Sequence, residues 1–190
     1  MRGHRFRLLF LGFGLAGLMV PALFLAPGLV KAAPERLSET LTIIDLDGSK
    51  IAITLEEMRK MPQETEWQCI CVGQKAGYIC IFDYGGVRLS AILEKAAAAM
   101  NASEYRKENM YVVFRGTDGY QVIASWTELT LAETGRRALV ALYADAKALS
   151  ESEGRFRIIF PSDKYVGRSV KCLEEIEIRC AEGCVDFGSH

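Results

Sequence analysis

The sequence predicts an α+β fold, in which short strands form mixed sheets and a few short helices pack beside them. Two observations carry this prediction. Short alternating apolar runs are separated by turn signals such as Asp47-Gly48 and residues 116–119, as in half-buried strands joined by hairpins. Capping boxes beginning at Thr54 and Ser125 each open a short helix. Strands mixed with short helices in this way are typical of α+β domains.

The elements are expected in a definite order along the chain. A first hairpin leads into a short helix that Pro62 stops. Two cysteine-bearing strands then flank a loop at residues 73–77, and the second continues through Gly85-Gly86 into an amphipathic helix at about 89–100. The other strands are expected at residues 40–46, 50–53, 110–114, 120–124, 138–143, 155–160 and 169–178.

Residues 1–32 are predicted to be a signal peptide or an N-terminal membrane anchor. Three arginines precede an uncharged apolar run at 8–30, which is longer than the core of a usual signal peptide and long enough to span a bilayer. Small residues near Ala32 suit a signal peptidase, so cleavage and retention both stay open. In either case residues 33–190 are expected to form one exported domain, periplasmic or anchored to the membrane and facing the periplasm.

Charge and histidine content exclude several classes of function. Residues 1–32 hold four of the 23 basic residues and none of the 24 acidic ones, which leaves 19 against 24 and a net charge of −5. No nucleic-acid partner is expected for such a domain. The two histidines are His4 and the terminal His190, so histidine-based nucleophilic catalysis, a histidine-rich zinc site and c-type haem attachment are not expected.

Cysteines are the most informative reactive side chains. Cys69 and Cys71 share one face of their strand, and each could be a metal ligand, half of a disulfide or a small buried hydrophobe. A four-residue connection would place Cys71 opposite Tyr78 and Cys69 opposite Cys80, within disulfide range. We therefore expect a Cys69–Cys80 disulfide and a free Cys71. The second expected disulfide is Cys180–Cys184.

Six pieces of sequence, taken in order, resemble a known family. They are I-T-L-E-E-M-R-K-M-P, C-V-G-Q, Y-G-G-V-R-L-S-A-I-L, V-V-F-R-G-T-D-G-Y, R-F-R-I-I-F-P and G-R-S-V-K-C-L-E-E-I-E-I. No single piece is specific, but together they cover residues 40–178 and resemble the molybdopterin-binding domain of the sulfite oxidase family. The resemblance implies that family's fold, its molybdenum-molybdopterin cofactor, and oxidoreductase activity on a small oxo-containing or anionic substrate.

The resemblance implies that Cys71 ligates molybdenum. Cys71-Val72-Gly73-Gln74 matches the family's Cys-x-Gly-Asn stretch, and a thiolate is a soft ligand suited to such a metal. The sequence departs from the family at Gln74, where Asn is usual, and at Lys75, where Arg is usual.

Two other pieces imply cofactor contacts. The family's phosphate-contacting segment is matched here by Arg168, Ser169 and Lys171, and cations suit phosphate. The alternative is that Arg168 and Lys171 are solvent-exposed strand residues with no ligand. A matching turn follows Arg115, and the resemblance implies that Arg115 and Tyr120 are catalytic, like Cys71, and that Asp118 contacts the cofactor. The Tyr120 hydroxyl would hydrogen-bond a metal oxo group. An ordinary hairpin turn is the alternative there.

Two main hypotheses of function follow. The first is an exported molybdopterin-dependent oxidoreductase with a small-molecule substrate or a redox partner protein. The second is the alternative, a cofactor-free binding module of the same fold. It is supported by the leader, which has no adjacent arginine pair for export of a folded, loaded protein. A thiol-disulfide oxidoreductase is a weaker third hypothesis, since Cys69-Ile70-Cys71 is not a Cys-x-x-Cys motif at a helix start.

Overall fold

In a computed structural model, residues 37–71, 77–97 and 107–181 are described, and at residues 69–71, 78, 79 and 97 the backbone alone. The chain divides into compact units Met1–Ala33 and Pro34–His190, and the features below belong to the second unit. The predicted leader lies outside the described residues. None of the helices in the described ranges has the length and apolar character that a membrane crossing would need.

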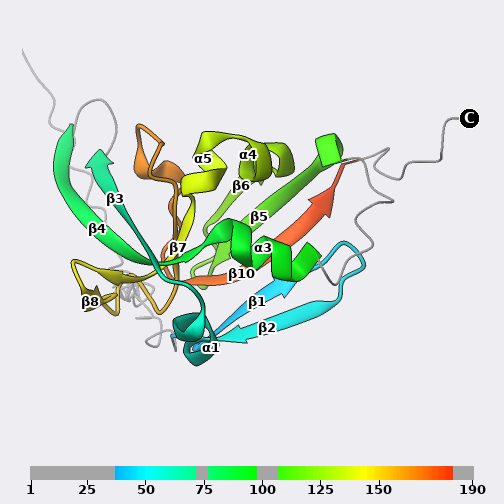
Figure 1. Ribbon diagram of the computed structural model, residues 1–190, viewed down its shortest axis with the longest axis horizontal. Helices are drawn as coiled ribbons and strands as arrows, with labels where there is room; N and C mark the ends of the chain where they lie inside the picture. The colour runs from blue at the N-terminus through cyan, green and yellow to red at the C-terminus, as the bar shows by residue number, and fades with distance from the viewer. Residues whose placement is uncertain (1–36, 72–76, 98–106, 182–190) are drawn as a thin grey trace, which may run out of the picture. The chain divides into compact units, whose positions relative to one another are not determined.

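Two five-stranded sheets form the domain. Figure 1 shows how their strands run. The first has the order β2-β1-β10-β5-β6, and the second has the order β3-β4-β7-β8 with β9 also pairing to β7. Strands β1 and β10 run parallel while their other neighbours are antiparallel, so the predicted mixed sheet is confirmed. The strands are β1 Thr40–Ile44, β2 Lys50–Thr54, β3 Glu64–Cys71, β4 Tyr78–Arg88, β5 Met110–Gly116, β6 Gln121–Ser125, β7 Leu139–Ala144, β8 Lys147–Ala148, β9 Arg157–Ile159 and β10 Leu173–Cys180.

Short helices connect and cover these strands (Figure 1). They are α1 Leu55–Lys60, α3 Leu89–Ala97, α4 Trp126–Leu131 and α5 Glu133–Arg137, with 3₁₀ turns η2 Lys107–Asn109 and η3 Val166–Arg168. The capping box at Thr54 is confirmed, because its hydroxyl accepts from the amide of Glu57 while the Glu57 carboxylate accepts from the amide of Thr54. At α4, Ser125 accepts from the amide of Glu128, but the Glu128 carboxylate bonds elsewhere.

The main hydrophobic core draws buried side chains from both sheets and from helices α1, α3 and α4. Phe114 and Ile176 come from the first sheet, Val87 and Val140 from the second, and all are essentially inaccessible to water. Helix α3 contributes its predicted apolar stripe, namely Leu89, Ile92, Leu93 and Ala96. This continuous core makes the two sheets one packing unit and holds the cysteine-bearing hairpin β3–β4 at its border.

Some elements differ from the sequence-based expectation. Asp145 and Ala146 form a turn with positive φ angles of 48° and 60° that leads into β8, a short strand that was not among those expected. Strand β10 begins at Leu173 rather than 169, because the preceding residues form η3 and a β-bridge from Val170 to Ile158.

Candidate functional site

The candidate site lies where strand β3 meets the segment at residues 160–171. Gln68, on β3, is buried, and its side-chain amide donates to the Phe160 carbonyl at 3.2 Å. The Ser169 hydroxyl donates to the Gln68 side-chain oxygen at 3.3 Å. These two hydrogen bonds connect Gln68 to residues that lie 92 and 101 positions further along the chain. Because strand residues are spaced about 3.3 Å apart, Cys71 lies only about 10 Å along the backbone from this contact.

Gln68 is a site residue that we did not predict. Strand alternation puts Gln68 and Ile70 on the face opposite Cys69 and Cys71. The same face carries Glu64 and Glu66, and this run of polar residues was the signal that could have found the site, because any of them that becomes buried needs hydrogen-bond partners.

The β3–β4 register is shifted at the cysteines. Cys71 pairs with Tyr78 as expected, but a bulge between Ile70 and Cys71 places Ile70 opposite Cys80, and Cys69 opposite Ile81. Cys80 is a free thiol. The predicted Cys69–Cys80 disulfide is therefore wrong, because one inserted residue moves the two cysteines out of direct opposition.

The other cysteine predictions are only partly addressed by the structure. Cys180 is disulfide-bonded. Its predicted partner, Cys184, lies outside the described residues, so the pairing stays a prediction. The Cys71 side chain is also outside the described residues, and its role as a metal ligand stays a prediction. In the described parts of the chain, no group of three or more His, Cys, Asp or Glu side chains could hold a metal ion.

Arg168, predicted to contact phosphate, is bound instead by two carboxylates of this chain. Its Nε and Nη2 donate to the Asp163 carboxylate at 2.7 and 2.6 Å, and its Nη1 donates to Glu128 at 2.8 Å. The guanidinium also lies 4.7 Å from the centre of the Phe160 ring. The hydrogen bonds to Asp163 raise the pKa of Arg168 above its ordinary value, against the opposing effect of burial.

Ser169 and Lys171 are better placed for an external ligand than Arg168. Ser169 is half-buried and uses its proton toward Gln68, which leaves its oxygen able to accept a hydrogen bond. Lys171 is exposed and has no ion-pair partner among the described residues. Their roles in phosphate binding stay predictions.

The turn between β5 and β6 packs against the same segment. The Tyr120 hydroxyl donates to the Gly167 carbonyl, and the Thr117 amide donates to the Cys172 carbonyl at 3.0 Å. Within the turn, the Tyr120 amide donates to the Asp118 carboxylate at 2.9 Å, and Gly119 has a φ of 81°. The structure thus brings Tyr120 to the candidate site, while it gives Asp118 the role of stabilising a hairpin turn.

Arg115, predicted to be catalytic, is not brought into this cluster. Its guanidinium forms ion pairs across the sheet with Glu175 at 3.1 Å and Glu177 at 3.4 Å, both on β10. The register places Arg115 directly opposite Glu175. Cross-strand pairing of opposite charges accounts for this arrangement.

A second buried ion-pair group supports the β3–β4 hairpin. Glu66 accepts from Arg137 at 2.7 and 3.1 Å and pairs with Arg88 at 2.7 Å. Burial opposes ionisation of this carboxyl, but the two arginines outweigh it and lower the pKa of Glu66. Arg137 also lies 5.7 Å from the Trp67 ring centre. This group ties the hairpin to helix α5.

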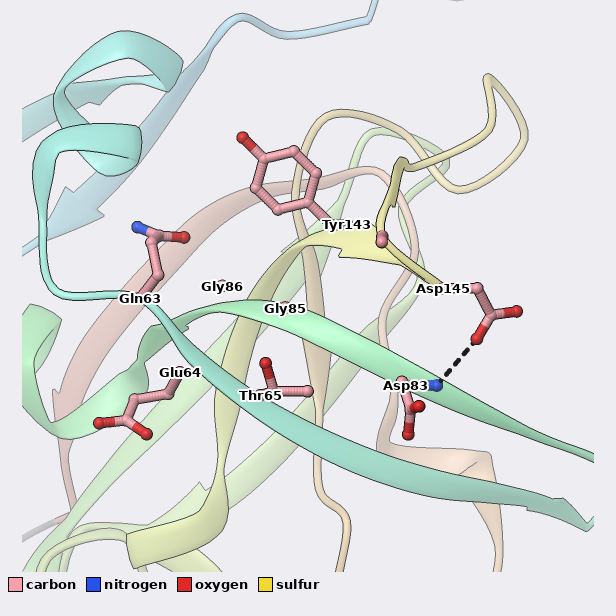
Figure 2. A pocket seen from close by; sticks show the side chains of 9 residues that line it. Gln63, Glu64, Thr65, Asp83, Gly85, Gly86, Tyr143 and Asp145 are labelled. Atoms are coloured by element: carbon pink, nitrogen blue, oxygen red, sulfur yellow. Dashed lines mark hydrogen bonds between the residues drawn. The ribbon is translucent and has the colours of Figure 1, made fainter.

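A cavity of about 410 Å³ lies elsewhere on the second sheet. Figure 2 shows the residues that line it. The cavity lies beside Gly85, Thr65 and Tyr143, and its lining includes carboxylates of Glu64, Asp83 and Asp145. No basic residue is among those that line it. This cavity therefore lacks the cations that a phosphate-bearing cofactor would need, and it does not coincide with the candidate site.

Comparison with known proteins decides the family. The sequence matches the family model described as "Oxidoreductase molybdopterin binding domain" over residues 31–183. The chain belongs to this family. The predicted resemblance and the sulfite-oxidase-like fold are thereby confirmed. No match was found among curated proteins.

A solved structure supports the fold of this molybdopterin-binding-domain family member. The sulfane dehydrogenase SoxCD from Paracoccus pantotrophus has a chain that superposes with a TM-score of 0.58 at 18% sequence identity. The match covers 83% of this chain and 41% of that chain. The present chain thus corresponds to less than half the length of the matched chain.

The described residues fit a molybdopterin phosphate only in part. Lys171 offers an uncompensated cation and Ser169 offers a hydroxyl, and both suit an anionic group. Arg168 does not fit, because two carboxylates already occupy its hydrogen-bond donors.

Proposed function

We propose that this domain is the cofactor-binding part of an exported molybdopterin-dependent oxidoreductase that acts on a small oxo-containing or anionic substrate. The contact between Gln68 and Ser169 carries the proposal, because it holds the strand leading to Cys71 beside the phosphate-matching segment. The cofactor, when bound, would supply the redox chemistry.

The chain's own residues would bind and orient that group. The Cys71 thiolate would ligate the metal, while Lys171 and Ser169 would hold the phosphate. The Tyr120 side chain is 47% exposed, and its hydroxyl donates a hydrogen bond to the Gly167 carbonyl. It would border the substrate side of the site. An oxidoreductase must also exchange electrons with another molecule, so a redox partner protein is part of the proposal.

Metal analysis of the protein purified from its natural host tests the proposal. We expect about one molybdenum per chain, and its loss in the Cys71→Ser variant with an unchanged far-UV circular dichroism spectrum. Cys80→Ser is the matched control, because Cys80 is a free thiol on the neighbouring strand and should leave the metal in place. Molybdenum at trace level in the unaltered protein would refute the proposal.

A second variant addresses the phosphate contact. Lys171→Glu should abolish cofactor retention, since it reverses the charge of an exposed residue while leaving the fold intact. Unfolding of this variant would show that Lys171 has a structural role instead.

Export and attachment are tested separately. If residues 8–30 are retained, the protein should stay with membranes after a carbonate wash. Recovery of a soluble chain beginning near Ala33 would show that the segment is a cleaved signal peptide.

A cofactor-free binding module is the second candidate function. It is supported by the ion pairs of Arg168 with Glu128 and Asp163. Because these carboxylates belong to this chain, the segment at residues 160–171 needs no external anion to neutralise Arg168. Counting accessible thiols separates the candidates, because a metal-binding Cys71 must be unpaired, whereas a structural Cys71 would be oxidised.

A further inference from the structure

Arg168 is held in a way that leaves little for a phosphate to bind. Asp163 accepts two hydrogen bonds in the bidentate geometry that a phosphate would adopt, and Glu128 accepts a third. One cation with two carboxylates has a net charge of −1. A phosphate approaching this group would meet repulsion rather than attraction.

The same contacts join three segments that are distant in sequence. Glu128 lies on helix α4, and Asp163 lies in the turn after Phe160, where its amide donates to the Phe160 carbonyl at 3.0 Å. Arg168 ends η3, and its guanidinium lies over the Phe160 ring. The ion pairs therefore fix the residues immediately before Ser169 and Lys171.

We propose that Asp163 and Glu128 serve as internal anions for Arg168, which makes Arg168 a positioning residue rather than a phosphate ligand. Its role is to hold Ser169 and Lys171 in place before any anionic ligand arrives. The assignment of phosphate binding to Lys171 rests on the proposed function. The hydrogen bonds from Arg168 to Asp163 and Glu128 do not depend on that function.

Removing the internal anions should expose a new anion site. We would titrate inorganic phosphate into the full chain, purified without cofactor, and follow binding by calorimetry. The double variant Asp163→Asn, Glu128→Gln keeps the shapes of both side chains and removes both charges. We expect it to bind phosphate at least about tenfold more tightly than the unaltered chain, because the guanidinium becomes available. Adding Arg168→Gln to the double variant should abolish this gain.

Arg168→Gln alone should separate positioning from ligand binding. We expect a loss of less than about tenfold in phosphate affinity, since Arg168 makes no direct contact with the anion and acts only through the placement of Ser169 and Lys171. Hydrogen exchange should quicken at the amides of Ser169 and Val170, which bond to the Val166 and Ile158 carbonyls at 2.9 and 3.2 Å. Arg155→Gln is the control, because Arg155 is a partly exposed arginine paired with Glu39 and lies outside the group around Arg168.

Two results would overturn the inference. One is a double variant that gains no phosphate affinity, and the other is a loss of about tenfold or more in phosphate affinity from Arg168→Gln alone. If the double variant does not fold, Asp163→Asn alone serves the same test, because it removes the charge of the bidentate carboxylate while Glu128 still holds Nη1 of Arg168. A chain that binds no molybdenum would refute the proposed function and leave this inference standing.

Discussion

Replacing Gly86 with alanine is expected to destabilise the domain strongly, whereas the same change at the adjacent Gly85 should be nearly neutral. A Cβ at Gly86 would lie 2.1 Å from the Val140 carbonyl oxygen and 2.8 Å from the Ala141 Cα. A Cβ at Gly85 would have the Cβ of Tyr143 as its nearest neighbour, at 3.6 Å, which is an ordinary contact. The two glycines are thus equivalent in sequence but not in the fold.

The size of the effect follows from what must move. The atoms near Gly86 are backbone atoms of β7, so relief requires β4 and β7 to separate by about 1 Å, which strains the ladder between them. Overpacking of this kind costs about 3 kcal/mol or more. At Gly85, alanine reduces the entropy of the unfolded chain and should stabilise by about 0.5 kcal/mol. For a domain of this size, the Gly86→Ala cost corresponds to a decrease of about 6–12 °C in Tm.

Urea and thermal unfolding, followed by far-UV circular dichroism, would measure both variants beside the unaltered chain. The expected result is a large loss for Gly86→Ala and no loss for Gly85→Ala. Equal unfolding midpoints for the two variants would refute the reasoning, because the close approach of β4 and β7 at Gly86 would then not exist in solution.

Three further predictions concern caps and titrating groups. Thr54→Ala should lower the free energy of unfolding by about 1 kcal/mol in urea denaturation, because it removes the reciprocal capping bonds with Glu57. Burial, with a further contribution from Glu153, raises the pKa of Tyr84 to about 12. The contribution of the neutral Tyr84 hydroxyl to the free energy of unfolding should therefore be lost as pH rises from about 10 to about 12. Tyr84→Phe should lack this alkaline loss, and an identical alkaline profile would contradict it. The pKa of Glu66 is lowered in the folded state. The ionised Glu66 carboxylate therefore adds to the free energy of unfolding above the ordinary glutamate pKa, and this stabilisation is lost in acid. The stability advantage over Glu66→Gln, measured by urea unfolding at a series of pH values, should shrink below about pH 4.5 and otherwise stay constant.

Local patterns were sufficient to predict most of the elements. Alternation and turn residues predicted the hairpin from Met110 to Ser125, and Gly119 has the positive φ that such a turn requires. The capping residues predicted where α1 and α4 begin, because a side chain that satisfies an orphan amide acts within three residues. The order of six motifs was enough to predict the family.

Other features depended on contacts between distant parts of the chain. The bulge at Ile70/Cys71 decided which residue faces Cys80, and no local pattern specifies a bulge, since it depends on how two strands and their neighbours pack. The partners of Arg168 lie five and 40 positions away. Its motif alone therefore suggested a ligand where the fold supplies two carboxylates.

The sequence by itself determined the α+β class, the helix starts and the family, because propensity, alternation and capping act over a few residues. The tertiary structure decided which polar side chains meet. Gln68 forms a hydrogen bond with Ser169, and Arg115 forms ion pairs with carboxylates of β10. Among the predicted cations in the described residues, only Lys171 has no carboxylate partner. Charges and amides pair according to three-dimensional distance and burial, and these arise only when the sheets pack together.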